Sequence, residues 1–353
     1  MSDGDAERAV EFTGPERVEV VPIDDPVPAP DEVVVSASVS AVSAGSELLA
    51  YRGELDPETV ADEELSSLDG DLSYPLRYGY AVVGRVTAVG DAVDAAWRDR
   101  TVFAFNPHES RFAVSPDALR PVPDGIDPET ATLFANAETA VTLTLDAAPR
   151  LGERVAVFGQ GVVGLLTTAL LARSGAETVV AVEPKDRRRE LAAEFGADAV
   201  VDPSRHDGRA GVVDAVRERA GDGVDLAVEV SGRPETLETA VETTRFDGRV
   251  LVGSWYGTKR ADLGFGDHFH RGRVTVRSSQ VTTIAPELRG RWDRERRRET
   301  AWRELRRLDA DLDVAERLVT DRVPVSGAPD AYRRLADEAE PTLQLLFTYP
   351  CTN

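Results

Sequence analysis

The chain has 353 residues, of which 63 are Asp or Glu and 41 are Lys or Arg, and its formal net charge is −22. This length suits two domains with a core in each. The negative charge disfavours a nucleic-acid partner, because phosphate binding relies on clustered Lys and Arg. No apolar run reaches the ~18 residues of a membrane span, and the first residues do not resemble a signal peptide. We therefore expect a cytoplasmic protein with no membrane partner.

Cysteine and lysine are both scarce. Cys351 is the only cysteine, which excludes an intramolecular disulfide and argues against a structural zinc cluster. Lys185 and Lys259 are the only lysines, and the carboxylates are spread along the whole chain. Such a composition resembles that of halophilic archaeal proteins, since dispersed carboxylates keep a protein solvated where salt screens their repulsion. We expect weaker folding at low salt.

Residues 1–130 are rich in short predicted strands and show no alternation of strands with helices. Apolar runs at 32–39, 81–89 and 100–105 are separated by Gly, Pro and Asp turns. This pattern is typical of a β-rich domain.

A glycine motif follows the apolar run 154–158. Gly159, Gly161 and Gly164 match the dinucleotide-binding pattern, with Val162 and Val163 between the last two. The glycines allow a tight turn, a close approach of backbone to a diphosphate and close helix packing, and the diphosphate then lies at the helix N-terminus. The motif predicts cofactor binding at these five residues.

The next predicted strand, at 177–182, is followed by Glu183. An acidic side chain there accepts hydrogen bonds from the adenosine ribose and repels a 2′-phosphate, which favours NAD. Basic residues just beyond, among them Arg188, could instead cradle the 2′-phosphate of NADP. Both cofactors stay open, with NAD preferred.

The strand–helix alternation continues over 131–315. Further strands are expected near 199–201, 226–230, 250–253 and 274–276, and a charged helix near 292–308. Together they predict an α/β fold with a doubly wound parallel sheet. Ser231 and Ser254, which follow the strands at 226–230 and 250–253, are further candidates for cofactor binding.

The last segment, 316–353, returns to the strand-rich character of the first block. With the glycine motif, the run Tyr78 to Val86, the turn Pro121 to Gly125 and the run Phe195 to Asp198, the chain resembles the medium-chain dehydrogenase/reductase superfamily over nearly its full length. The resemblance implies a Rossmann domain at 131–315 and a GroES-like catalytic domain at 1–130, completed by 316–353. It also implies an oxidoreductase with a small-molecule substrate, and a homodimer.

The zinc ligands of that superfamily are missing from this sequence. The places that match the catalytic ligands carry Ala44, Tyr80 and Glu138, and the cysteines of the structural zinc lobe are also absent. Catalytic zinc needs three protein ligands, so one carboxylate would not hold it. The run Ser43 to Leu48 resembles the zinc-lacking subgroup that includes hydroxyethyl-bacteriochlorophyllide dehydrogenase. We therefore expect no zinc.

Without zinc, a protein group must exchange the proton of the substrate hydroxyl while hydride moves to or from the nicotinamide. By the resemblance, Ser46 matches a proton-relay residue, although it could equally be a serine that caps a helix starting near Glu47. Tyr80, Glu138 and His108 are further candidates for the catalytic acid or base, and each could alternatively be structural or solvated.

Two weaker features complete the sequence-based predictions. Trp255 or Tyr256 could line the substrate pocket or simply pack at a strand end. His268 and His270 could bind a metal, but a loop facing substrate or solvent is favoured because no third ligand is near.

The preferred hypothesis is a zinc-independent NAD-dependent oxidoreductase acting on a secondary alcohol or its ketone. The alternatives are an NADPH-dependent quinone or enone reductase, and a dinucleotide-binding protein without catalysis.

Overall fold

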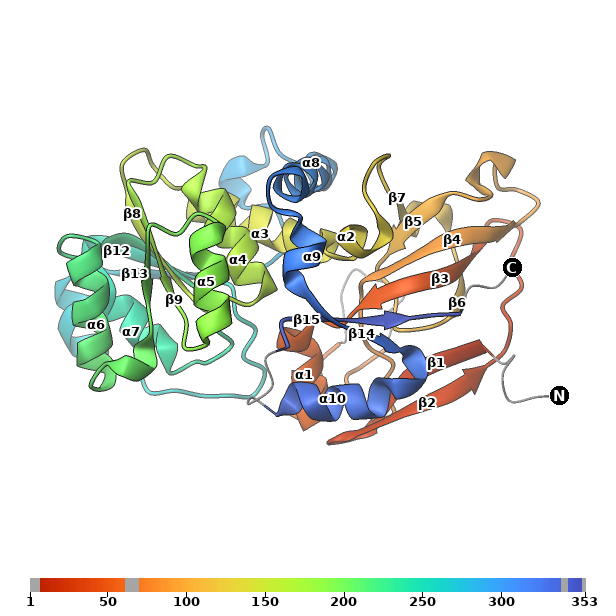
Figure 1. The fold of residues 1–353 in the computed structure, drawn as a ribbon, viewed down its shortest axis with the longest axis horizontal. Coiled ribbons are helices and arrows are strands. Elements are labelled where there is room, and N and C mark those ends of the chain that lie inside the picture. Colours follow the sequence, from red (N-terminus) through yellow and green to blue (C-terminus); the bar gives the residue numbers. More distant parts are fainter. Residues whose placement is uncertain (1–6, 61–69, 338–341, 351–353) are drawn as a thin grey trace. The chain divides into compact units, whose positions relative to one another are not determined.

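The computed structural model describes residues 7–60, 70–337 and 342–350 (Figure 1). Its contacts divide the chain into two compact units. Unit 1 combines 1–135 with 313–353, and unit 2 comprises 136–312. No helix in the described part of the chain is both long and apolar enough to cross a membrane.

Unit 1 is built on an antiparallel sheet. The order is β14-β15-β3-β4-β5-β7, β6 also pairs with β3, and β1 and β2 form a separate hairpin. One apolar core joins the sheet to helices α1 and α10. The strands are β1 (Glu7–Gly14), β2 (Arg17–Ile23), β3 (Val33–Ala41), β4 (Val82–Val89), β5 (Thr101–Ala104), β6 (Arg111–Val114), β7 (Leu119–Pro121), β14 (Val319–Pro324) and β15 (Gln344–Thr348). The helices are α1 (Ala44–Arg52), α2 (Pro128–Thr132), α9 (Val314–Leu318) and α10 (Ala328–Ala336).

Unit 2 is a parallel sheet with the order β10-β9-β8-β11-β12-β13. Its strands are β8 (Arg154–Phe158), β9 (Thr178–Val182), β10 (Ala199–Val201), β11 (Val224–Glu229), β12 (Thr244–Val252) and β13 (Thr275–Ser278). Its helices are α3 (Phe134–Ala147), which begins in unit 1, α4 (Val162–Ala172), α5 (Asp186–Glu194), α6 (Gly208–Arg219), α7 (Thr236–Thr243) and α8 (Arg294–Leu312). This α/β architecture confirms the predicted fold class.

Helices cover both faces of the parallel sheet, which explains why β8, β9 and β11 are nearly continuous apolar runs. Alternate residues of these strands pack against α3 and α4 on one face and against α6 and α7 on the other. The strand order is that of a dinucleotide-binding fold, in which the direction of winding reverses between β8 and β11. The carboxyl ends of the strands therefore define the expected ligand site of unit 2.

Candidate functional site

The glycine turn joins the end of β8 to the start of α4. Gly159 has φ +92°, and a Cβ placed on it would lie 2.6 Å from the Ser231 Cα atom, so only glycine fits. A Cβ on Gly164 would lie 2.0 Å from the Gly159 carbonyl oxygen, which allows the close helix packing. A Cβ on Gly161 would meet no atom within 4 Å. Gly161 thus leaves open space at the helix N-terminus, where the first-turn N–H groups of Val162 and Val163 can receive an anion.

Glu183 is fixed at the end of β9, with 4% of its surface exposed. Its two carboxylate oxygens accept hydrogen bonds from the backbone N–H of Gln160, at 2.8 Å, and of Lys185, at 3.0 Å. The first of these bonds ties the carboxylate to the glycine turn. The remaining lone pairs of this carboxylate suit ribose hydroxyls.

The basic residues beyond Glu183 differ in their surroundings. Arg189 is buried, donates a hydrogen bond to the Glu183 carbonyl oxygen at 2.8 Å and lies 3.0 Å from an Asp202 carboxylate oxygen. Arg188 lies in the first turn of α5, with its N–H donating to the Lys185 carbonyl oxygen at 3.1 Å. Arg189 is thus held by an acidic partner, and Arg188 remains a candidate phosphate ligand.

Ser231 and Ser254 lie at the ends of neighbouring strands. The Ser231 N–H donates to a carboxylate oxygen of Glu229 at 2.8 Å, and the Ser254 hydroxyl accepts from the Gly232 N–H at 2.9 Å. The Tyr256 hydroxyl donates to the other carboxylate oxygen of Glu229. Tyr256 is therefore bound to a buried carboxylate, whereas Trp255 is 44% exposed.

Unit 1 brings Ser46 and Tyr80 together. Their hydroxyl oxygens are 2.7 Å apart, and both side chains are partly exposed. Burial raises the pKa of the Tyr80 phenol above 10.0, an effect that hydrogen bonds with Ser43 and Ser46 partly oppose. The phenol therefore stays protonated at neutral pH and can donate a hydrogen bond. Helix α1 begins at Ala44 with Ser43 as its N-cap, so the alternative of Ser46 as the helix cap is wrong.

Behind this pair lies a fully buried polar network, which we call the Glu47 network. One Glu47 carboxylate oxygen accepts from the Ser43 N–H at 2.6 Å, and the other lies 3.0 Å from His108 Nε2 and accepts from the Tyr332 hydroxyl. His108 Nδ1 lies 2.7 Å from the Ser40 hydroxyl oxygen, which in turn lies 2.8 Å from the Tyr349 hydroxyl. Both ring nitrogens of His108 are thus occupied inside unit 1. This geometry favours a positioning role for His108 over contact with substrate.

The network holds both segments that carry the hydroxyl pair. Glu47 lies in the first turn of α1, directly after Ser46. Gly79, with φ +111°, precedes Tyr80, and a Cβ on Gly79 would lie 2.6 Å from the His108 ring. The imidazole therefore packs directly under the bend that presents Tyr80.

Glu138 lies in α3 within unit 2 and is 3% exposed, so the alternative of a solvent-exposed helix carboxylate is wrong. One of its carboxylate oxygens lies 2.7 Å from Arg297 Nη2 and 3.5 Å from Arg298 Nε. Arg297 also donates to the carbonyl oxygens of Val281 and Thr283. This buried ion pair joins α3 to α8 and leaves Glu138 poorly placed as a proton carrier.

The residues at the superfamily's zinc-ligand places do not fit a zinc ion. Ala44 offers no donor atom, the Tyr80 phenol is hydrogen-bonded to Ser46, and the Glu138 carboxylate is engaged by Arg297. Within residues 7–60, 70–337 and 342–350, no three His, Cys, Asp or Glu side chains form a metal-binding group. His268, for which the sequence favoured a loop role over metal binding with His270, has its Nε2 2.9 Å from the Thr244 carbonyl oxygen.

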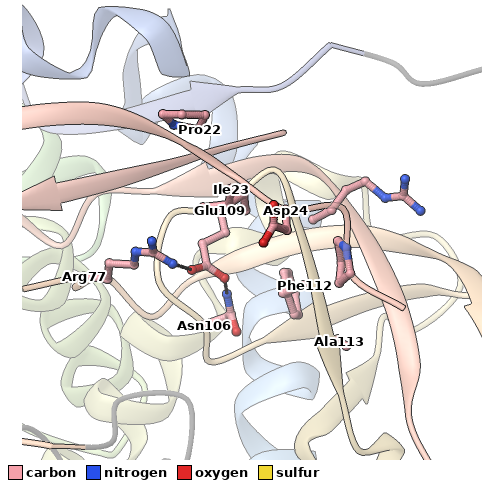
Figure 2. Close-up of a pocket in the computed structure, with 10 residues that line it drawn as sticks. Pro22, Ile23, Asp24, Arg77, Asn106, Glu109, Phe112 and Ala113 are labelled. Atoms are coloured by element: carbon pink, nitrogen blue, oxygen red, sulfur yellow. Dashed lines mark hydrogen bonds and ion pairs between the residues drawn. The ribbon is translucent and has the colours of Figure 1, made fainter. Parts of the chain in front are cut away.

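Unit 1 also carries an open polar pocket of about 500 Å³, drawn in Figure 2. Glu109 crosses it, with one carboxylate oxygen 3.1 Å from Arg77 and the other 3.3 Å from the Asn106 amide nitrogen. None of the residues that line this pocket is one of the four candidate catalytic residues. This pocket of unit 1 is therefore separate from the hydroxyl pair.

Comparison with known proteins identifies the family. L-threonine 3-dehydrogenase of Pyrococcus abyssi (strain GE5 / Orsay) is 31% identical over 277 residues, which cover 69% of this chain and 75% of that protein. (R,R)-butanediol dehydrogenase of Bacillus subtilis (strain 168) is 28% identical over 276 residues, covering 70% and 78%. The chain belongs to the medium-chain dehydrogenase/reductase family. It is an oxidoreductase of the alcohol dehydrogenase type.

Two further comparisons bear on this oxidoreductase. Residues 162–295 match the family model described as zinc-binding dehydrogenase. That stretch lies wholly in unit 2 and contains none of the positions 44, 80 and 138. The crystal structure of 2R,3R-butanediol dehydrogenase from Bacillus subtilis has the same fold, with a TM-score of 0.77 at 22% identity over 98% of this chain and 100% of the other.

Sequence reasoning missed the partners of its own candidates. The pairs Glu47–His108 and Glu138–Arg297 join residues 61 and 159 positions apart, and no local pattern indicates them. Glu229 was also overlooked. Its signal was an acidic residue directly after the apolar run 226–228 in a strand buried on both faces, where an unpartnered carboxylate would be too costly.

Proposed function

We propose that this oxidoreductase transfers hydride between NAD(H) and a secondary alcohol or its ketone, without zinc. NAD(H), when bound, accepts or supplies the hydride at its nicotinamide ring. The observation that carries the proposal is the 2.7 Å pair of Ser46 and Tyr80 hydroxyls at a place where zinc enzymes of the family have a metal ligand.

In the direction of ketone reduction, the Tyr80 phenol donates a hydrogen bond to the substrate carbonyl oxygen and then its proton. The proton that the phenol gives up is replaced through Ser46, whose partly exposed hydroxyl passes its proton to Tyr80 and takes one from water, so that both groups return to their starting state. In alcohol oxidation the same two groups take the proton away. The Glu47 network holds both segments in place, and no residue of this arrangement needs a metal.

The cofactor preference rests on Glu183. Its carboxylate is fixed by two backbone N–H groups, so it cannot turn away from a 2′-phosphate. The negative charges of the carboxylate and of the phosphate would then repel each other. The glycine turn, Val162, Val163, Ser231 and Ser254 complete the proposed NAD site. A structural neighbour of the same fold, rspB from E. coli CFT073, is described as complexed with NADH, with a TM-score of 0.77 at 17% identity.

The substrate class follows from the relatives' names and from Tyr80. Butanediol and threonine are both secondary alcohols, and these two names belong to relatives of 28% and 31% identity. A single hydrogen-bond donor such as the Tyr80 phenol suits the carbonyl oxygen that such an alcohol becomes.

The chain's own second copy is the expected partner. Strand β13 forms an edge of the parallel sheet, and all four of its residues are exposed. An unpaired strand edge can extend its sheet across a two-fold axis. We expect sedimentation velocity to show a dimer, and a monomer at all concentrations would contradict this.

The test of the cofactor and metal proposals is calorimetric titration of NADH and NADPH in molar salt, with zinc measured on the same sample. We expect NADH to bind at least about tenfold more tightly, the equivalent of about 1.4 kcal/mol, with no stoichiometric metal. Stoichiometric zinc would overturn zinc independence. Tighter binding of NADPH would overturn the role of Glu183 and direct the substrate search to quinones and enones.

A further inference from the structure

The buried carboxylate of Glu229 is not needed by the proton transfer proposed above. Glu229 is 0% exposed and ends β11, where it lies level with Phe158 of β8 and Val252 of β12. A buried carboxylate is costly unless its oxygens are hydrogen-bonded. Its contacts therefore indicate what it stabilises.

Each oxygen of this carboxylate holds a different loop. One accepts from the backbone N–H of Ser231 at 2.8 Å and from its hydroxyl, and so fixes the loop after β11. The other accepts from the Tyr256 hydroxyl, and so fixes the loop after β12. The Gly232 N–H donates to the Ser254 hydroxyl oxygen at 2.9 Å, which joins the two loops directly.

The same cluster also touches the glycine turn. The Ser231 Cα atom lies 2.6 Å from the place that a Cβ of Gly159 would take, and the Val230 N–H donates to the Phe158 carbonyl oxygen at 2.9 Å. Three consecutive strand ends, those of β8, β11 and β12, are thus held together around Glu229. We call Glu229, Ser231, Ser254 and Tyr256 the Glu229 clasp.

The position of the clasp in the sheet indicates what it serves. A dinucleotide lies across the carboxyl ends of the strands, with one nucleotide on each side of the point where the winding reverses, here between β8 and β11. Glu183, at the end of β9, belongs to the adenosine side. The clasp, at the ends of β11 and β12, therefore lies on the nicotinamide side.

We propose that Glu229 and Tyr256 are positioning residues that hold the strand-end loops on which the nicotinamide half of the cofactor rests. This inference rests on the proposed binding of NAD(H). Tyr256 then acts through Glu229 and the loop it fixes, a role that differs from both sequence-based alternatives, lining the substrate pocket or packing at a strand end. Burial is the main cause that raises the pKa of the Tyr256 phenol, and the Glu229 charge is the second. The phenol therefore remains a hydrogen-bond donor at neutral pH.

The test compares NADH with ADP-ribose, which has the adenosine and diphosphate but lacks the nicotinamide. Titration of both ligands into the full-length protein and into Tyr256→Phe measures the two halves separately. We expect the variant to bind NADH about tenfold more weakly, because a hydrogen bond to a charged group is lost, and ADP-ribose within about twofold of the wild type.

Two further variants serve as controls for this test. Glu229→Gln keeps the shape and can still bond to Ser231 and Tyr256, so we expect a smaller loss of NADH affinity than in Tyr256→Phe. Tyr332→Phe removes the same kind of bond, from a tyrosine to a buried glutamate, but in unit 1. It should leave the affinity for both ligands unchanged.

The possible results separate the two proposals. Equal losses for NADH and ADP-ribose in Tyr256→Phe, or no loss for either, would overturn the positioning role while leaving NAD(H) binding intact. Failure of the wild-type protein to bind both ligands would overturn the proposed function itself.

Discussion

The Glu47 network and the Glu229 clasp are built from the same chemistry and differ in what surrounds them. In each, a fully buried glutamate accepts a hydrogen bond from a tyrosine and another from a backbone N–H. The partners of Glu47 include His108 and Tyr332, each of which is 0% exposed, whereas Tyr256 retains exposed surface at the strand ends. We therefore expect substitutions in the Glu47 network to act mainly on stability and those in the Glu229 clasp on ligand binding.

The largest effect that this comparison predicts is on stability. Glu47→Ala leaves the Ser43 N–H, the His108 ring and the Tyr332 hydroxyl without their acceptor in a buried site. We expect the free energy of unfolding to fall by about 3–5 kcal/mol, measured by urea denaturation. Glu47→Gln, which keeps the volume and an acceptor oxygen, should lose less than half as much. A loss within about 1 kcal/mol for Glu47→Ala would show that the network is not a stabilising unit.

The next largest effect is on catalysis, at Tyr80, which lies beside the Glu47 network. Tyr80→Phe removes the proposed proton donor, and we expect kcat to fall by about 100-fold with a confirmed substrate. The unfolding transition should change less than in Glu47→Ala, because Tyr80 is only partly buried.

Tyr78→Phe provides the matched control for Tyr80→Phe. The Tyr78 ring lies 6.1 Å from that of Tyr80, edge to face, and the substitution should leave kcat within about twofold. An unchanged kcat in Tyr80→Phe would remove the phenol from the mechanism.

A third effect is a loss of folding stability at alkaline pH, which we expect from the buried tyrosines of the Glu47 network. Burial, and then the Glu47 charge, raises the pKa of Tyr332, and burial also raises that of Tyr349. A folded-state pKa above the unfolded value of 10.0 means that the stabilisation is complete below pH 10 and is lost as the pH rises through the higher value. We expect the midpoint of urea unfolding to fall above pH 10, and to fall less steeply in Tyr332→Phe. Identical slopes in the two proteins would contradict the shift.

The smallest effect is the salt dependence of Tm, which involves neither the Glu47 network nor the Glu229 clasp. The excess of exposed carboxylates repels itself in dilute buffer and is screened in molar KCl. We expect Tm to rise by about 5 °C or more on addition of salt, equally in the wild type and in Glu47→Gln, since buried pairs are little screened. A Tm that does not rise would remove the halophilic interpretation of the composition.

The sequence predicted what depends on local pattern. The strands of the parallel sheet and the glycine turn follow from apolar runs and from glycines at fixed spacing, and the α/β class is confirmed by the strand order and by the family. The hairpin of β1 and β2 was missed, because its alternation includes several charged residues.

The candidate site was predicted less completely, because its geometry depends on contacts between distant segments. Ser46 and Tyr80 were each named but not as a pair, and they are 34 positions apart. His108 was named as a candidate acid or base, yet the side chain is buried among partners that only the fold brings together. A residue type indicates which chemistry is available, whereas its neighbours decide whether that chemistry reaches a ligand.

The contact between Gly79 and His108 has a practical consequence for protein engineering. A Cβ on Gly79 would lie 2.6 Å from the imidazole, so a side chain at position 79 would displace His108 or the bend that carries Tyr80. A library intended to change substrate preference should keep both residues and vary positions elsewhere. A smaller residue at position 108 would not make position 79 replaceable, because the φ of +111° at Gly79 strains any other side chain.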